Sequence, residues 1–309
     1  MTFSDIPRTL LSLLSIWHTN DDISHKKDLY IRKKIQKKIK NIKFNNKNLK
    51  KTHKEFNKKI LNLLLSNDLK NFLRKNFIQK IFFLQNRFFI LKELKKIKKS
   101  KNWKLYKNLL IEDPIGNPIR YFMYPQSSGN RINHLYHLIV FEEVLKTNIK
   151  NKFKIIFEFG GGYGCMARIF SKINTKIKYI CYDTAYVNLL QYYFLKHNNL
   201  DVGFKKKNKF FLTSNLNKTK KNNDLFIANW SLSETPINFR KKFFKIIASS
   251  KYILICFQEK FENIDNLKYF NSLKSKLSKK FDIKIKKNKF YKGNIFFKQN
   301  HYFFLGKKL

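Results

Sequence analysis

Ile155-Ile156-Phe157-Glu158-Phe159-Gly160-Gly161-Gly162-Tyr163-Gly164 is the stretch that decides the fold of this chain. An apolar run that ends in an acid and then in closely spaced glycines is typical of a buried strand entering a tight turn. Residues 165–173 have the pattern of the helix that follows. Glycine lacks the Cβ atom that would keep the backbone from turning sharply and from approaching a ligand. The stretch therefore predicts a nucleotide-type ligand site.

A second acid supports this interpretation. Lys178-Tyr179-Ile180-Cys181-Tyr182-Asp183 is another apolar run that ends in an acid, one helix and one turn after the glycines. In nucleoside and dinucleotide sites, an acid roughly 20 residues beyond the glycines accepts hydrogen bonds from ribose hydroxyls. Asp183 has that place. The dinucleotide pattern G-x-G-x-x-G does not fit, because Cys165 stands there and the last glycine comes one residue early.

The spacing E-x-G-x-G-x-G, with a following strand that ends in an acid, instead resembles the class I S-adenosylmethionine-dependent methyltransferases. The resemblance implies S-adenosylmethionine as cofactor, with the glycine turn on its methionine and ribose parts and Asp183 on the ribose hydroxyls. Residues 224–231 form a third apolar run with a polar end, whose last side chains should line the adenine or sulfonium side. A plain strand-to-helix turn and a nicotinamide site remain as alternatives, and core filling remains as one for Trp230. The expected cofactor-binding residues are Glu158, Gly160, Gly161, Gly162, Tyr163, Gly164, Asp183, Asn229 and Trp230.

Strands and helices alternate after the glycine turn. This predicts an α/β fold: a Rossmann-like class I methyltransferase sheet, mostly parallel, with helices on both faces. One strand falls at 202–204 or at 210–212, and the pattern does not choose between them. The last two runs, 281–286 and 301–305, have no helix between them. They should therefore pair antiparallel at the sheet edge, as the last strand does in class I methyltransferases. The other expected segments are helices at 186–197, 238–248 and 264–277 and a strand at 252–257.

The first 110 residues lack glycine and space their apolar residues as helices do. Basic helices are expected at 23–42 and 49–65, and a long helix at 69–97. We expect two domains, a basic helical region at 1–110 and the methyltransferase domain at 111–309. The basic face is suited to a membrane or to RNA, although a charge run is more commonly a solvated face. Between the domains, the sequence predicts a short strand at 119–123, a polar loop at 125–130 and a helix from about 131 to 145 that caps the carboxyl edge of the sheet.

A narrower resemblance, over roughly residues 112–305, is to the sugar O-methyltransferase family. It is carried by Tyr182-Asp183 followed by Val187-Asn188-Leu189-Leu190-Gln191, by Asn229-Trp230-Ser231-Leu232-Ser233-Glu234, and by Asn133-His134-Leu135-Tyr136. Thr184-Ala185 stands where that family usually has Leu-Pro. The resemblance implies a hydroxyl of a sugar as acceptor, on a glycan or nucleotide-sugar precursor.

Two nucleic-acid chemistries are disfavoured by the loop after the third apolar run. Enzymes that methylate exocyclic base nitrogens resemble one another in an Asn/Asp-Pro-Pro-aromatic sequence there, whereas Asn229-Trp230-Ser231-Leu232 contains no proline. Cytosine-C5 methylation needs a nucleophilic cysteine, and Cys256 lies inside an apolar run. Methylation of an RNA ribose hydroxyl remains open, as does a binding module without catalysis.

A sugar hydroxyl is a poor nucleophile, so a base that takes its proton is expected. His134 and His137, on one face of the capping helix, are candidates because a histidine pKa of about 6.5 suits proton transfer. Glu234 is the reserve candidate, and its alternative role is that of an acid at a helix N-terminus. Asn130, Arg131 and Asn133 are expected to bind the substrate. No cluster of carboxylates calls for a metal ion.

The composition of the chain is strongly basic. The net charge is +46 and favours a polyanionic partner, although the chain is rich in Lys, Asn, Ile and Phe, the residues of AT-rich codons. The 43% hydrophobic content is ample for a core. The three cysteines form no ligand pair and are expected to be buried. An acid and a proline near the N-terminus, and no long apolar run, predict a cytoplasmic protein without a membrane span. The oligomeric state is not predicted.

Overall fold

A computed structural model describes residues 24–42, 51–84, 86–219, 222–291 and 299–309, with side chains from residue 55 on in the second range. The chain packs into two compact units. One takes in the residues up to 135 together with 162–165 and 184–203, and the other takes in 136–161, 166–183 and 204–309. This division by packing does not follow the expected domain boundary at residue 110, which stays a prediction.

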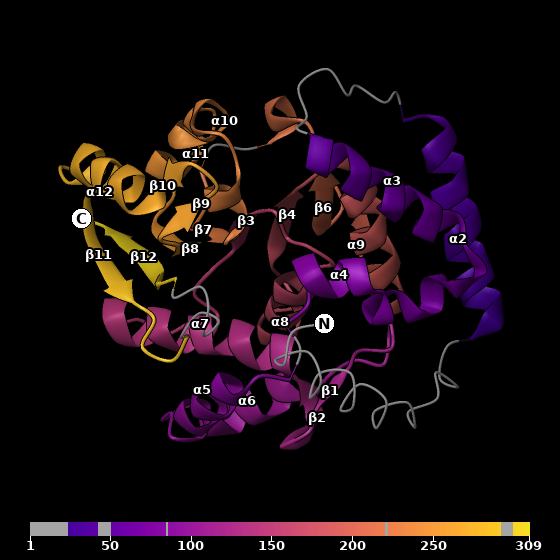
Figure 1. Cartoon of the computed structure of the whole chain (residues 1–309), viewed down its shortest axis with the longest axis horizontal. Helices are drawn as coiled ribbons and strands as arrows, with labels where there is room; N and C mark the ends of the chain where they lie inside the picture. Colours follow the sequence, from indigo (N-terminus) through magenta and orange to yellow (C-terminus); the bar gives the residue numbers. More distant parts are fainter. Residues whose placement is uncertain (1–23, 43–50, 85, 220–221, 292–298) are drawn as a thin grey trace. The chain divides into compact units, whose positions relative to one another are not determined.

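The first unit is mainly helical (Figure 1). Phe72 is fully buried in this unit, and its ring centroid lies 5.9 Å from that of Tyr163 and 6.4 Å from that of Phe194. The expected basic helices at 23–42 and 49–65 are confirmed where the chain is described, and both pack on the helix at 185–197. The elements of this unit are α2 (His25–Lys40), α3 (Lys51–Leu65), η2 (Asn67–Arg74), α4 (Asn76–Ile81), α5 (Phe88–Lys98), α6 (Trp103–Leu110), β1 (Arg120–Tyr121), β2 (Tyr124–Ser128), α9 (Ala185–His197) and β5 (Val202–Gly203).

The expectation of one long helix at 69–97 was wrong, because η2, α4 and α5 divide this stretch. Neither glycine nor proline breaks it. Instead, hydrogen bonds to other parts of the unit replace those that a continuous helix would make. The backbone N–H of Leu84 donates to Asn130 Oδ1 at 3.2 Å, and Asn86 Oδ1 accepts from the backbone N–H of Phe122 at 2.9 Å. Tertiary bonding therefore overrides a helical spacing that the sequence does show.

The segment expected as a polar loop at 125–130 is also different. Most of it forms β2, which pairs antiparallel with β1 as a small hairpin. The next helix, α7 (Gly129–Leu145), begins two residues earlier than expected. Ser128 explains that start, since its hydroxyl oxygen accepts from the backbone N–H of Arg131 at 3.1 Å in the manner of an N-cap.

The second unit is built on a sheet. Its seven strands lie in the order β11-β12-β8-β7-β3-β4-β6, and only β12 runs antiparallel to its neighbours. Counted along the chain, the order is 3-2-1-4-5-7-6. The predicted α/β fold, a mostly parallel Rossmann-like class I methyltransferase sheet with an antiparallel last strand, is confirmed. The strands are β3 (Ile155–Phe159), β4 (Lys178–Tyr182), β6 (Phe210–Thr213), β7 (Leu225–Asn229), β8 (Tyr252–Gln258), β11 (Phe281–Lys287) and β12 (His301–Lys308).

The expected antiparallel pair of closing strands is present at the sheet edge. β12 lies between β8 and β11, so β11 is the edge strand. Burial explains this order. Residues 303–306 of β12 are all buried, whereas β11 exposes Asp282 and Lys284 in alternation with buried residues. A continuous apolar run needs cover from both sides, and an alternating strand with charges tolerates an open edge.

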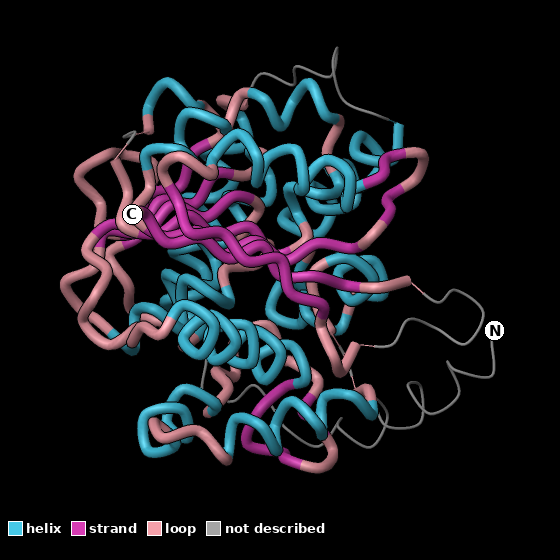
Figure 2. The backbone as a smooth tube through the Cα atoms, turned by 90° about the vertical axis from the view of Figure 1, so that its left-hand side faces the viewer, coloured by secondary structure: helices cyan, strands magenta, loops and turns pink. Residues whose placement is uncertain are grey.

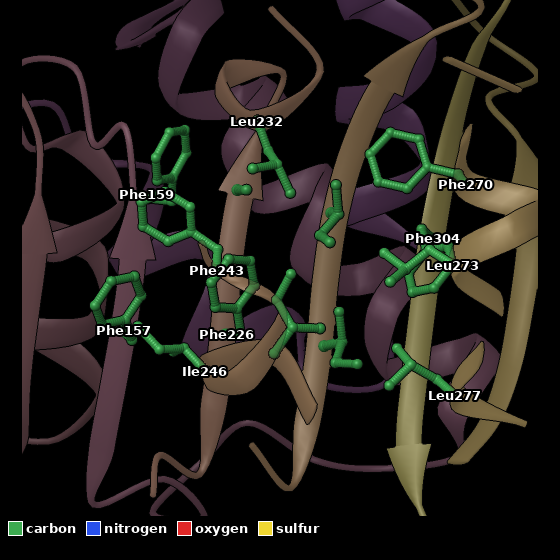
Figure 3. Close-up of a cluster of buried hydrophobic side chains, with 14 of the residues drawn as sticks. Phe157, Phe159, Phe226, Leu232, Phe243, Ile246, Phe270, Leu273, Leu277 and Phe304 are labelled. Atoms are coloured by element: carbon green, nitrogen blue, oxygen red, sulfur yellow. The ribbon is translucent and has the colours of Figure 1, made fainter. Parts of the chain in front are cut away.

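Helices cover both faces of this sheet (Figure 2). On one face, side chains of β3, β7, β8 and β12 pack with α10 (Ile237–Lys241), α11 (Phe244–Ser249) and α12 (Asn266–Leu277) (Figure 3). The ring centroids of Phe159 and Phe243 are 4.5 Å apart there. On the other face, Phe153 lies 6.1 Å from Phe141 of α7 and 6.3 Å from Phe170 of α8 (Cys165–Ile173). The remaining short elements are η3 (Leu216–Lys218), η4 (Ser231–Glu234), β9 (Lys260–Phe261) and β10 (Ile264–Asp265).

Two smaller expectations are also resolved. Both segments that competed for one strand are extended, and β6, at 210–213, is the one that pairs with β4. All three cysteines are buried, as expected. No helix in the described part of the chain has both the length and the apolar character that crossing a membrane requires.

Candidate functional site

The candidate site lies at the carboxyl ends of β3, β4 and β7. β3 is the central strand of the three, paired in parallel with β4 on one side and β7 on the other. The chain leaves β3 toward β4 and returns on the opposite side at β7. Open α/β sheets bind their ligands outside such a switch point, at the carboxyl ends of the strands. The topology therefore brings Glu158, Gly160, Asp183 and Asn229 to one edge of the second unit.

Gly160 is required at this edge for packing as well as for its backbone conformation. Its φ is +70°, and a Cβ atom added there would lie 2.2 Å from the Cβ of Ser231. The hydroxyl of Ser231 donates to the carbonyl oxygen of Phe159, and the N–H of Gly160 donates to the carbonyl of Tyr182 at 2.8 Å. Short polar contacts thus join the ends of β3 and β4 and the loop after β7, and the close approach of Ser231 to residue 160 requires glycine there.

Gly162 and Gly164 are required for a different reason, which is their backbone conformation. Gly162 and Gly164 have φ angles of +56° and +101°, in the left-handed region that favours glycine. A Cβ at Gly162 would meet Phe82 of the first unit at 3.5 Å, an ordinary contact distance. The backbone conformation, and not crowding, therefore calls for glycine at 162. Tyr163 is fully buried in the first unit, where its hydroxyl accepts from Asn130 Nδ2 at 3.0 Å.

The two acids at the edge differ in their surroundings. Glu158 is 2% exposed, and its Oε2 accepts from the hydroxyl of Tyr179 at 3.0 Å. Burial raises the pKa of Glu158 to about 8, so this carboxyl keeps its proton at neutral pH. Asp183 directly follows β4 and is half-buried, and its N–H donates to the carbonyl of Thr213 at 3.1 Å. One acid is thus placed to donate a hydrogen bond and the other to accept.

Asn229, at the end of β7, has a buried amide. Neither its Oδ1 nor its Nδ2 has a hydrogen-bond partner among the described residues. A buried polar group without a hydrogen-bond partner lowers the stability of the folded state by about 1–3 kcal/mol. The next residue, Trp230, has a φ of +59°, which is strained for a bulky side chain. Strain and unpaired buried groups of this kind gather at functional sites.

Two contacts hold Trp230 in this conformation. Its backbone N–H donates to the carbonyl of Cys256 at 2.7 Å, and its Nε1 donates to Nδ1 of His301 at 2.8 Å. Indole nitrogen is a donor only, so Nδ1 of His301 must be the acceptor and the proton of the neutral ring must lie on Nε2. Burial lowers the pKa of His301 to about 4, which keeps the ring neutral. His301 therefore presents an Nε2–H donor at the start of β12.

His137, one of the expected bases, is fully buried. Its ring centroid lies 5.2 Å from that of Trp230 and 5.3 Å from that of Phe303. It reaches the carboxyl edge of β7, as expected for a capping helix, but as a packing partner of Trp230.

Glu234, the reserve base, lies in η4, four residues beyond Trp230. Its Oε1 accepts from Nε2 of Gln258 at 3.3 Å, and Gln258 accepts from the hydroxyl of Ser233 at 2.7 Å. Burial raises the pKa of Glu234 to about 7. A carboxylate that titrates near neutral pH is well matched to the task of a general base. Among the three candidate bases, Glu234 has the most suitable chemistry.

Arg240 holds the backbone on both sides of Glu234. Its Nη2 donates to the carbonyl of Ser233 at 2.6 Å and its Nε to the carbonyl of Thr235 at 2.7 Å. The guanidinium is fully buried, 4.7 Å from the ring centroid of Tyr269, and burial lowers its pKa to about 10. This role of Arg240 could not be predicted from the sequence, because Arg240 precedes Lys241 and Lys242 in a run that has the pattern of a solvated basic surface.

The expected substrate-binding residues all belong to the first unit, where their side chains contact other residues of that unit. Arg131 is fully buried, and its Nη2 contacts Glu112 at 2.7 Å and Asp113 at 2.6 Å. Nδ2 of Asn133 donates to both carboxyl oxygens of Glu93 at 3.0 Å. Asn130 bonds Leu84 and Tyr163, as described above. These three side chains make contacts within the protein, and their expected contact with a substrate stays a prediction.

His134, the remaining candidate base, is also in the first unit. Its Nδ1 lies 2.8 Å from the carbonyl oxygen of Asn130. A carbonyl oxygen can only accept, so Nδ1 carries the proton and Nε2 is the basic atom. Burial lowers the pKa of His134 to about 4, which makes it a weaker base than Glu234.

No protein-family model matches the chain, and no curated protein matches it in sequence. Solved structures do match it. The methyltransferase domain of bacterial CtHen1 is 9% identical, over 57% of this chain and 97% of that one, with a TM-score of 0.41. Precorrin-6y C5,15-methyltransferase from Geobacter metallireducens is 11% identical, over 59% and 89%, with a TM-score of 0.38. The fibrillarin/Nop5p complex is 12% identical, over 57% and 80%, with a TM-score of 0.39. Similarity this low bears on neither the reaction nor the substrate. The description of the fold therefore rests on the strand order of the sheet.

Proposed function

We propose that this chain is an S-adenosylmethionine-dependent methyltransferase. The observation that carries the proposal is the buried amide of Asn229 at the switch point of the sheet, with no partner for its donor or its acceptor. A ligand that offers both an acceptor and a donor would remove the cost of this unpaired group. The edge of an adenine ring offers both, in a ring nitrogen and an amino group. The residues present therefore fit the cofactor that the resemblance implies.

The other groups of the edge complete the proposed cofactor site. Asp183 would accept from the ribose hydroxyls, and the protonated Glu158 would donate to an oxygen of the ligand. The backbone after Gly160 would lie along the methionine part, because no side chain stands between them. When bound, S-adenosylmethionine supplies a methyl group activated by a positively charged sulfur.

We propose a sugar hydroxyl as the acceptor. A sugar offers hydroxyls to polar groups and an apolar ring face to an aromatic side chain, and the edge has both kinds of partner. Glu234 accepts, Nε2–H of His301 donates, and Trp230 supplies an aromatic ring. The sequence resemblance to sugar O-methyltransferases and the absence of proline after Asn229 support the same acceptor class.

In this scheme Glu234 would take the proton of the acceptor hydroxyl, and the bound cofactor would supply the methyl group. A base positioned in this way contributes about 10²- to 10⁴-fold in rate. Arg240 positions the base through the carbonyls of Ser233 and Thr235, and the bond from Trp230 holds His301 in the tautomer that donates. His134, His137, Asn130, Arg131 and Asn133 have no step in this scheme.

A second candidate is methylation of an RNA ribose hydroxyl. The net charge of +46 specifically favours it, because a polyanion would be drawn to such a surface. The same base and donor would serve, since a ribose is also a sugar. The two candidates differ in their substrate and not in their chemistry.

A transfer assay separates them. The chain is incubated with S-adenosylmethionine and either a panel of nucleotide sugars or total RNA, and S-adenosylhomocysteine is measured. We expect product with a nucleotide sugar, a loss of about hundredfold or more in Glu234→Gln, and no loss in Glu143→Gln, which removes an exposed carboxylate of α7. Methylation of RNA alone would favour the second candidate, and no product with either would contradict both.

A further inference from the structure

The β1–β2 hairpin of the first unit exposes apolar side chains at its turn. Phe122 and Met123, which join the two strands, are 39% and 50% exposed. Phe88, at the start of α5, is 80% exposed. Large side chains exposed singly are ordinary, but several on neighbouring segments of one unit indicate a candidate binding surface. We call Phe88, Phe122 and Met123 the apolar patch.

Contacts within the unit fix the hairpin against α5. Phe122 N–H donates to Asn86 Oδ1 at 2.9 Å, and the hydroxyl of Tyr121 donates to the carbonyl of Arg87 at 3.2 Å. At the other end of α5, Lys98 Nζ lies 5.2 Å from the ring centroid of Tyr124. Figure 1 shows α5, α6 and the hairpin side by side. The apolar patch is therefore part of one folded surface and not a loose loop.

The surroundings of the apolar patch are cationic. Residues 86–128 contain three acids, Glu93, Glu112 and Asp113, and all three are buried. The exposed face of α5 repeats at helical spacing, with Phe88 followed by lysines on the same side. The exposed lysines of α5, α6 and their connection are Lys92, Lys95, Lys98, Lys99, Lys101, Lys104 and Lys107. Within residues 86–128, the acids are thus buried and the charged side chains exposed to solvent are lysines.

We propose that this surface docks the protein on a membrane whose lipids carry anionic headgroups. Side chains such as Phe and Met lower their free energy by entering the boundary between headgroups and acyl chains. Lysines beside them are attracted to the negative surface potential of such a membrane, and their long stems let them lie at the interface. RNA would use the lysines but would gain nothing from burying Met123, so the apolar patch favours lipid. This proposal does not rest on the methyl-transfer activity.

Sedimentation of the full chain with vesicles tests the proposal. We expect binding to vesicles of phosphatidylcholine mixed with phosphatidylglycerol, weaker binding to phosphatidylcholine alone, and a loss of binding as salt is raised. Phe122→Ser combined with Met123→Ser should weaken the binding by about tenfold or more. The matched control is Leu29→Ser combined with Tyr30→Ser. These two residues are adjacent in the sequence of the basic helix α2, and they are 46% and 53% exposed. That control should bind as the wild type does.

Three results would overturn the proposal. One is vesicle binding that the hairpin variant leaves unchanged, because charge alone would then account for it. Another is an equal loss in the α2 control, which would place the contact elsewhere or make it nonspecific. The third is no vesicle binding by the folded wild type, whether or not it binds polyuridylate. Circular dichroism of each variant establishes that a loss of binding is not a loss of fold.

Discussion

At the scale of single residues, the glycines of the turn after β3 serve different needs. Gly160→Ala places a Cβ 2.2 Å from that of Ser231 and keeps a φ of +70°. We expect it to lower the free energy of unfolding by about 2–5 kcal/mol. Gly162→Ala meets no crowding and should cost only the left-handed backbone, about 1–2 kcal/mol. Urea denaturation of both variants measures the difference, and equal losses would contradict the packing described for Gly160.

Glu234 should set the pH dependence of the reaction. Its pKa of about 7 predicts that kcat/KM rises with pH up to about 7 and then levels, because the deprotonated form is the base. Arg240→Lys keeps a positive charge but cannot hold the carbonyls of Ser233 and Thr235 together. We expect the rise to move to lower pH in this variant, since a looser carboxyl is better solvated and its pKa falls.

The pH profile separates positioning from mere stability. A variant that was only less stable would keep the rise near pH 7 with a smaller amount of active protein. A rise at unchanged pH in Arg240→Lys would therefore contradict the positioning role of Arg240.

The place of some of these residues in the site could be predicted from the sequence, and that of others could not. Asp183 and Asn229 end apolar runs, and the ends of parallel strands meet at one edge, so their place could be predicted. His301 and Gln258 could not, because they meet Trp230 and Glu234 only through the pairing of β12 with β8. The ion pairs of Arg131 with Glu112 and Asp113 could not be predicted either, because the two buried acids lie in a segment well before Arg131 in the sequence.

At the scale of elements, Glu93 of α5 connects to Asn133 of α7 inside the first unit. Burial raises the pKa of Glu93 from 4.5 to about 8. As pH rises, the unfolded chain therefore loses this proton before the folded one does. The free energy of unfolding should fall by up to about 1.4 kcal/mol per pH unit between about pH 4.5 and 8 for this group.

Glu93→Gln tests this link between α5 and α7. The variant keeps a hydrogen-bond acceptor for Asn133 and has no proton to lose, so it should gain stability relative to the wild type as pH rises from 5 to 8. Urea midpoints at both pH values measure the change, with Glu143→Gln as the exposed control. An equal pH dependence in the variant and the wild type would show that Glu93 is ionised in the folded state.

The presence of helices and strands was easier to predict from the sequence than the positions where a helix breaks. The alternation after residue 155 predicted the sheet and its helices, because buried strands and amphipathic helices differ in period. The breaks between η2, α4 and α5 were not predictable, since they depend on hydrogen bonds to Asn130 and to the hairpin. The insertion of β12 beside β8 follows from its four consecutive buried residues, a pattern that is clear only once its neighbours are known.

At the scale of the whole molecule, the charge should limit stability. With a net charge of +46, repulsion among lysines opposes folding and is screened by salt. We expect the free energy of unfolding to rise as sodium chloride is raised from low to physiological concentration. Thermal unfolding across a salt series measures this, and a midpoint independent of salt would show that the charges are spaced too widely to interact.

The central claim is that the carboxyl edge of β3, β4 and β7 binds S-adenosylmethionine, and calorimetric titration tests it most directly. The wild type should bind, and Asp183→Asn should bind about 10- to 100-fold more weakly, because it loses a charged acceptor for the ribose hydroxyls. Asp282→Asn, which removes an exposed carboxylate from β11, should bind as the wild type does. No binding by the folded wild type, or equal binding by Asp183→Asn, would contradict the claim.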